Sequence, residues 1–140
     1  MSLIATQLRR KLVSSRYAFT QTTGFASGSK IKEITNTTQW DELVKNSTSS
    51  GRPAIVQFTA VWCPPCKMIA PVLEELAGKH TDLDFVKLDI DNHAVTNIVA
   101  DYSVAAVPTF VSLKGDKKVH AFSGADRNQL QKMVEDMSDL

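Results

Sequence analysis

The stretch "VWCPPCK", Val61 to Lys67, holds both cysteines of a 140-residue chain. Cys63 and Cys66 enclose only Pro64 and Pro65. A structural disulfide stabilises most when it closes a long loop, because it then removes the most conformational entropy from the unfolded chain. A bridge across two prolines would stabilise little. The spacing therefore favours a pair of reactive thiols.

Strand and helix patterns alternate along the chain on both sides of this stretch. Strands are expected at residues 32–34, 54–58, 85–91, 109–113 and 118–122. Helical stripes are expected at residues 37–46, 69–76, 95–102 and 130–137. Thr38 is the expected N-cap of the first helix, residues 47–53 are an expected loop, and Pro71 is expected to kink the helix after the cysteines.

This order of elements predicts the fold class. Alternating strands and helices imply parallel strands joined by helical crossovers, whereas the turn signal at residues 114–117 implies an antiparallel C-terminal hairpin. We expect an α/β protein with one mixed central sheet, flanked by helices on both faces. The length suits one domain with a substantial core.

The position of Cys63 predicts its chemistry. It lies between a buried strand and a helix, where the unpaired backbone N–H groups of the helix start lower the pKa of a thiol. Cys66, one turn further on, is expected to be more buried. A zinc site would need two more ligands, and His80, His93 and His120 show no paired spacing. A static disulfide or a pair of inert thiols would also be compatible with the spacing.

Charge is distributed unevenly along the chain. The net charge of +1 indicates no nucleic-acid partner, and the short apolar runs indicate no membrane span. Residues 1–29 carry +4 with no acidic residue, and the remainder carries −3. Ile4, Leu8 and Leu12 would line one face of a helix in this segment. We predict that residues 1–29 are a disordered transit peptide, mitochondrial (matrix) rather than plastid, with Arg16 near a processing site. A tail of chance charge bias, in a cytosolic protein, is the alternative.

Several longer motifs are similar to the thioredoxin family. They are "FTAVWCPPCKMIAPVLEELA", "FVKLDID", "VAAVPTFVSLKGDK" and "FSGA", and they span residues 30–140 at the family's separations. The resemblance implies the thioredoxin fold and a thiol–disulfide oxidoreductase that reduces protein disulfides, in which Cys63 is the nucleophile and Cys66 the resolving thiol. Their redox-active disulfide is then the only redox group, and no cofactor is bound. NADPH serves indirectly through thioredoxin reductase, and the substrates are protein disulfides such as those of peroxiredoxins or reductases. A monomer is expected.

The resemblance also implies roles for residues around the cysteines. Val107–Pro108 becomes a cis peptide bond facing the cysteines, although "VPT" alone suits an ordinary trans turn. Val107 would then pair with substrate backbone. Trp62 becomes part of a docking surface rather than a core aromatic, and Gly124 a close-approach position rather than a plain turn glycine. Lys87 lies below the site or is simply solvated.

Two positions depart from the family pattern. Pro64 replaces the usual glycine, a form similar to some plant thioredoxins and to trypanosomatid tryparedoxins, so a low-molecular-weight dithiol or glutathione is an alternative electron donor. Gln57 replaces a buried aspartate to which the family assigns a role in proton transfer with the second cysteine. Since glutamine does not titrate, Cys66 is expected to depend on water or another group for deprotonation. A thioredoxin-like binding scaffold without turnover is the rival from another class.

Overall fold

The computed structural model describes residues 29–140, so the predicted transit peptide and its processing site lie, apart from Ser29, outside the described residues. Five strands form one sheet in the order β1-β3-β2-β4-β5. The strands are β1 (Ile31–Glu33), β2 (Ala54–Thr59), β3 (Asp84–Asp89), β4 (Thr109–Lys114) and β5 (Lys117–Ser123). The helices are α2 (Thr37–Ser50), α3 (Pro64–Lys79), α4 (Thr96–Asp101) and α5 (Arg127–Ser138), with a short 3-10 turn η1 (His93–Val95) before α4.

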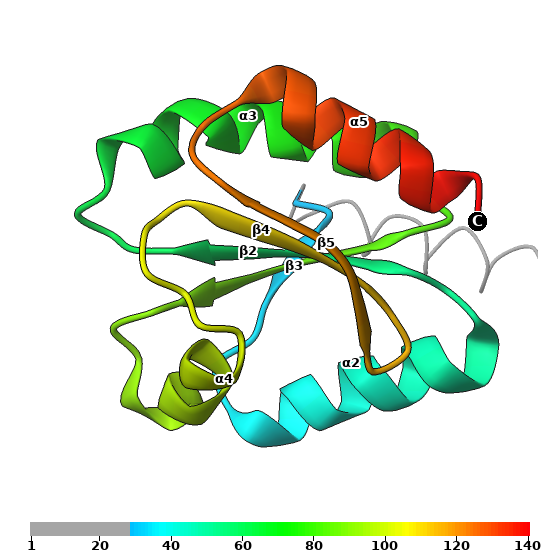
Figure 1. The fold of residues 1–140 in the computed structure, drawn as a ribbon, viewed down its shortest axis with the longest axis horizontal. Helices are drawn as coiled ribbons and strands as arrows, with labels where there is room; N and C mark the ends of the chain where they lie inside the picture. Colours follow the sequence, from blue (N-terminus) through cyan, green and yellow to red (C-terminus); the bar gives the residue numbers. More distant parts are fainter. Residues whose placement is uncertain (1–28) are drawn as a thin grey trace, which may run out of the picture.

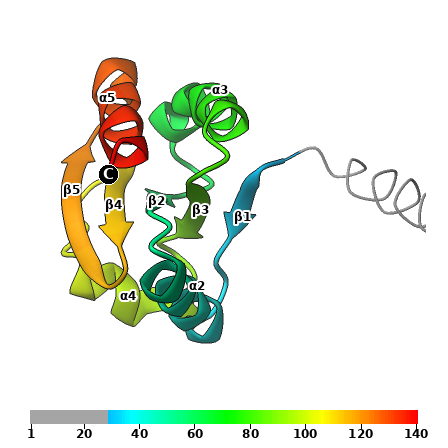
Figure 2. The same ribbon diagram turned by 90° about the vertical axis from the view of Figure 1, so that its right-hand side faces the viewer.

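The sheet is mixed, as the sequence predicts. β1, β3 and β2 pair in parallel, whereas β4 is antiparallel to β2 and β5 is antiparallel to β4. Figures 1 and 2 show α3 and α5 on one face of the sheet and α2 and α4 on the other. The predicted thioredoxin fold is confirmed. Among residues 29–140, no helix is long and apolar enough to cross a membrane.

Each face of the sheet has its own apolar core, because side chains of a strand alternate between the two faces. The face toward α2 and α4 carries Val56, Phe58, Val86, Leu88 and Val111 against Trp40, Leu43 and Ile98. The face toward α3 and α5 carries Ile55, Phe85 and Phe110 against Ile69, Leu73, Leu130, Met133, Val134 and Met137. β2 is buried on both faces, and the segment with the two cysteines follows it directly.

The first helix differs from the prediction at both ends. Its N-cap is Asn36, whose side chain accepts a hydrogen bond from the Gln39 N–H, so the prediction of Thr38 was wrong. Asn36, Thr37 and Thr38 are all residue types that cap helices, and the helix begins directly after the first of them. The helix also continues to Ser50, through part of the expected loop, and ends at Gly51 with φ of +73°.

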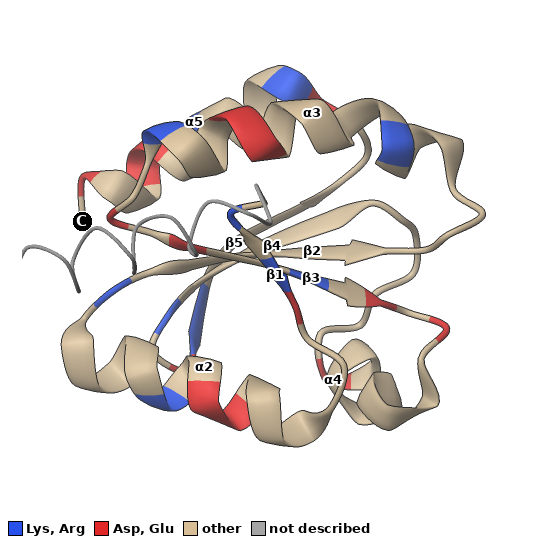
Figure 3. Cartoon of the chain, turned by 180° about the vertical axis from the view of Figure 1, so that it is seen from behind, with Lys and Arg blue, Asp and Glu red and all other residues tan. Residues whose placement is uncertain are grey.

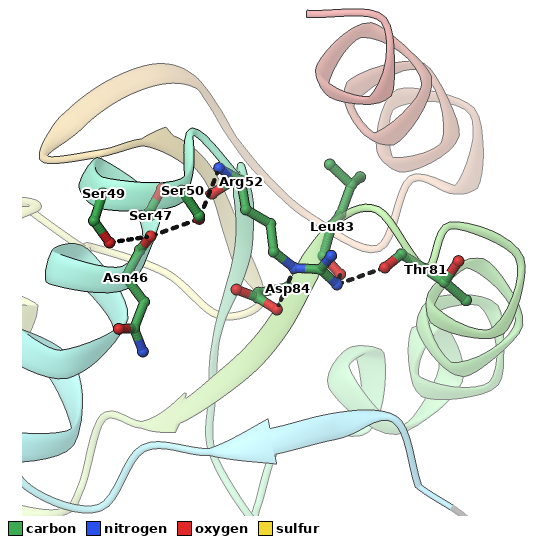
Figure 4. A network of polar contacts seen from close by, with 8 residues as sticks. All are labelled: Asn46, Ser47, Ser49, Ser50, Arg52, Thr81, Leu83 and Asp84. Atoms are coloured by element: carbon green, nitrogen blue, oxygen red, sulfur yellow. Dashed lines mark hydrogen bonds and ion pairs between the residues drawn. The ribbon is translucent and has the colours of Figure 1, made fainter.

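Ser47 explains why the helix extends so far. It is buried (1% exposed), and its hydroxyl donates to the Arg52 carbonyl oxygen at 2.6 Å and accepts from the Gly115 N–H at 2.8 Å. A stretch of small polar residues such as 47–50 is typical of a loop. Here the hydrogen bond from the buried Gly115 N–H, in the β4–β5 turn, holds Ser47 in the helix. Arg52 continues this network, since its guanidinium pairs with Asp84 at 2.8 Å and donates to the carbonyl oxygens of the segment before β3 (Figure 4).

The remaining differences are small. β1 begins one residue before the expected strand, and β3 ends at Asp89, two residues before the expected end. Pro71 lies inside α3, and its kink stays a prediction.

Candidate active site

The two cysteines lie where β2 passes into α3. Cys63 is the N-cap of α3 in extended backbone conformation, and its sulfur accepts the Cys66 N–H at 3.2 Å. Pro64 and Pro65 occupy the first helical positions, where a missing N–H costs no hydrogen bond. The predicted location of Cys63 at a helix start is confirmed. Its sulfur therefore lies in the field of an N-terminus that favours negative charge.

Cys63 and Cys66 form a disulfide with a Cα–Cα distance of 5.3 Å, within the usual range for such bridges. Both are buried, with 2% and 3% of their surface exposed, in a small cluster with Ala60. The expectation that Cys66 is the more buried of the two is wrong for this disulfide form. The bridge turns both sulfurs toward the same cluster, so their exposure does not distinguish them.

Val107–Pro108 is a cis peptide bond, as the family resemblance implied. The Val107 carbonyl oxygen lies 3.7 Å from the Cys63 sulfur, and the Val107 side chain packs on the cysteine cluster. Pro108 is buried, and its carbonyl oxygen accepts the Gly124 N–H at 2.8 Å. Gly124 has φ of +108°, a conformation that favours glycine. The hydrogen bond from Gly124, directly after β5, thus holds the Val107–Pro108 segment in place beside the disulfide.

An exposed apolar surface adjoins the disulfide. Val61, Trp62 and Met68 expose 74%, 62% and 75% of their surface. The Trp62 indole N–H donates to an Asp91 carboxylate oxygen at 2.7 Å, which fixes the ring over the loop after β3. Trp62 is thus no core aromatic. The sequence reasoning did not single out Val61, Met68 and Asp91. Apolar residues on both sides of the motif were a signal for the first two, and the acidic end of "FVKLDID" was one for Asp91.

A cavity of about 220 Å³ lies behind the disulfide, on the α3 face of the sheet. Cys66 lines it, together with Gln57 and Lys87, which are partners in the β2–β3 register. Gln57 is buried, and Lys87 is exposed at the cavity's edge. Glu33 of β1 also lines the cavity, although the sequence reasoning did not select it. The strand order was the missing signal, because it places β1 next to β3.

The histidines considered for a zinc site lie on different elements, namely the end of α3, η1 and β5. In residues 29–140, no three His, Cys, Asp or Glu side chains are grouped so that they could hold a metal ion.

Comparisons with known proteins agree with this geometry. The family model described as Thioredoxin matches residues 31–136. A thioredoxin H-type of Brassica campestris is 40% identical over 92 residues, which cover 66% of this chain and 73% of that protein. The crystal structure of a thioredoxin from Nicotiana alata has a TM-score of 0.72 and 33% identity, covering 78% of this chain and 93% of that one. The oxidised form of mitochondrial thioredoxin 3 from Saccharomyces cerevisiae has a TM-score of 0.67 and 34% identity, with coverages of 76% and 94%.

Proposed function

Because this chain belongs to the thioredoxin family and is a thiol–disulfide oxidoreductase that reduces protein disulfides through Cys63 and Cys66, we propose that Cys63 is the attacking thiol and Cys66 the resolving thiol. The observation that carries this assignment is the N-cap position of Cys63, whose sulfur already receives the Cys66 N–H. That hydrogen bond and the helix start stabilise a thiolate at Cys63 once the disulfide is reduced.

The reaction then proceeds in two exchanges. The Cys63 thiolate attacks one sulfur of a substrate disulfide, forming a mixed disulfide and releasing the other substrate sulfur as a thiolate. The Cys66 thiol loses its proton and attacks the Cys63 sulfur, which releases the second substrate thiolate and forms the Cys63–Cys66 bond. Two electrons pass from this chain to the substrate, and the substrate thiolates take up two protons.

The surface around the disulfide suits an extended polypeptide as substrate. Trp62, with Val61 and Met68, supplies exposed apolar contact area around the cysteine motif, and the Val107 carbonyl oxygen lies 3.7 Å from the Cys63 sulfur. A substrate segment that pairs with the Val107 backbone in the manner of an added strand would bring its disulfide to Cys63. Pro64, Pro65, Pro108 and Gly124 then act by shaping this surface. Peroxiredoxins and protein reductases are substrates of this kind.

We further propose that NADPH-dependent thioredoxin reductase recharges the disulfide and that the protein works in the mitochondrial matrix. The basic, acid-free segment 1–29 supports import, and a mitochondrial thioredoxin of yeast is among the similar structures. Plastid and cytosol are the alternative compartments. Because Pro64 replaces the usual glycine of the motif, glutathione or a low-molecular-weight dithiol is the alternative electron donor. A fluorescent protein fused after residue 29 should be imported into mitochondria; a diffuse cytosolic signal would contradict this localisation.

Insulin reduction by the full chain tests the activity, with NADPH and thioredoxin reductase compared against glutathione. Turnover should be fast with the reductase and should be lost in Cys63→Ser, whereas a binding scaffold would keep its partners in that variant. Cys66→Ser should accumulate a mixed disulfide with substrate.

In reduced wild type, brief iodoacetamide treatment should label Cys63 first; preferential labelling of Cys66 would reverse the assigned roles. A chain lacking residues 1–29 should reduce insulin at the full rate.

A further inference from the structure

The sheet face under α3 changes from apolar to polar along the parallel strands. One row across three adjacent strands consists of Ile31, Phe85 and Ile55, which belong to the α3 core or pack on it. Two residues further along, the corresponding row consists of Glu33, Lys87 and Gln57. Since side chains at positions i and i+2 of a strand share a face, this second row also points toward α3. Figure 3 shows the charged positions of β1 and β3 next to each other.

This polar row opens into the cavity that Cys66 lines. Glu33, Gln57 and Lys87 are all among the residues around its 220 Å³, with the first turns of α3 on the opposite side. Polar side chains form part of its lining, it is open to solvent, and its volume has room for several water molecules. Water there can join the Cys66 sulfur to the side chains of the row.

Cys66 needs a proton acceptor in this place. As the resolving thiol it must be deprotonated before it attacks the mixed disulfide, because the thiolate is the nucleophile. Gln57 faces the same cavity from β2, but an amide cannot accept the proton. Neighbouring strands lie about 5 Å apart, so the backbone of Glu33 on β1 is about 10 Å from that of Gln57 on β2, with Lys87 between them. From there the Glu33 side chain can extend into the cavity.

We propose that Glu33 is the proton-accepting carboxylate for Cys66, acting through cavity water and beside Lys87. The proton leaves the Cys66 thiol for the Glu33 carboxylate, the Cys66 thiolate attacks the Cys63 sulfur, and the substrate leaves as a thiolate that solvent protonates. Lys87 lies between the two ends of this path, where its positive charge stabilises both carboxylate and thiolate. Glu33 is thus a positioning residue that never contacts the sulfur.

The other charged side chains around the cavity suit this role less well. They are Lys67 on α3, Lys87 and Asp89 on β3. The two lysines are cationic donors with no acceptor. One carboxylate oxygen of Asp89 already accepts the Asp91 N–H at 2.9 Å, in the turn that ends β3. Glu33 alone combines a carboxylate with a place in the row of Gln57.

The inference rests on the proposed roles of the cysteines, and a two-phase assay separates it from them. Reduced full-length protein is mixed with the disulfide of thionitrobenzoate in a stopped-flow instrument across pH 5–9. The first release of thionitrobenzoate reports attack by Cys63, and the second reports resolution by Cys66. Glu33→Gln should leave the first phase unchanged and slow the second about tenfold near neutral pH, which is less than the roughly hundredfold or greater effect of a directly contacting proton acceptor, because water intervenes. The deficit of the variant should shrink toward pH 9, where hydroxide deprotonates the Cys66 thiol without a protein acceptor.

Three further variants make the test specific. Glu33→Gln combined with Gln57→Asp should recover the second phase, since a carboxylate then faces the cavity from β2. Asp41→Asn, which removes a carboxylate from α2 on the opposite face of the sheet, should match wild type in both phases. The proposal is overturned if Glu33→Gln keeps the wild-type second phase and pH profile, or if Asp89→Asn, rather than Glu33→Gln, slows that phase. Loss of the first phase in wild type would instead refute the assignment of Cys63.

Discussion

Replacing Ser47 by alanine should destabilise the fold strongly for so small a change. The substitution removes one oxygen that joins three segments: the end of α2, the Arg52 carbonyl before β2, and the Gly115 N–H in the β4–β5 turn. The site is buried, so water does not replace the lost partner.

The magnitude follows from the two hydrogen bonds. A typical intramolecular hydrogen bond contributes about 1 kcal/mol net, and a buried group left without a partner costs about 1–3 kcal/mol. With one donor and one acceptor orphaned, we expect Ser47→Ala to lower the free energy of unfolding by about 2–3 kcal/mol. For a domain of this size that corresponds to a melting temperature lower by about 10 °C.

Guanidinium unfolding of the oxidised full-length protein, followed by far-ultraviolet circular dichroism, measures this loss. Ser49→Ala is the matched control, because Ser49 is an exposed residue of the same helix end and gains the same helix propensity. It should change the free energy of unfolding by less than about 0.5 kcal/mol. Equal stabilities of the two variants would refute the reasoning that the buried hydroxyl holds the three segments together.

Three other changes test individual elements. Asn36→Ala should cost about 1 kcal/mol in thermal or chemical unfolding, because the Gln39 N–H loses its cap. Gly124→Ala should cost about 1–3 kcal/mol although no atom lies near the added methyl group, since φ of +108° is strained for alanine; an unchanged stability would mean that this loop relaxes freely. Hydrogen bonds from the Gln129 side chain and backbone lower the pKa of Asp126, so its contribution to stability should be complete above the ordinary aspartate pKa and be lost as pH falls through the lowered value. Asp126→Asn should remove that acidic decline while keeping the cap of α5.

Patterns that repeat within one element were readable from the sequence. The alternating strands, the helical stripes such as that of Leu130 and Val134, and the hairpin turn at Gly115 all depend on neighbours within a few residues. The same holds for Cys63, whose place at a helix start follows from the strand before it and the prolines after it. These features were predicted correctly for that reason.

Features that depend on contacts between distant segments were not predicted. Ser47 was assigned to a loop because its partner, Gly115, is 68 residues away. Glu33 received no role because its neighbours, Lys87 and Gln57, become visible only through the strand order. The equal burial of the two cysteines depends on the disulfide itself and on the Val107 loop. The cis bond at Pro108 was predicted only through the family resemblance, since the local sequence suits either isomer.

The strand order also ranks the backbone amides by their rates of hydrogen exchange. β2 is hydrogen-bonded to strands on both sides and buried on both faces, so its amide protons should exchange only when the whole domain unfolds. β1 has three residues and a partner on one side alone, so local opening should expose its amides to solvent much sooner. The cysteine segment thus follows the slowest-exchanging strand, while Glu33 lies on a strand that can detach without unfolding the domain.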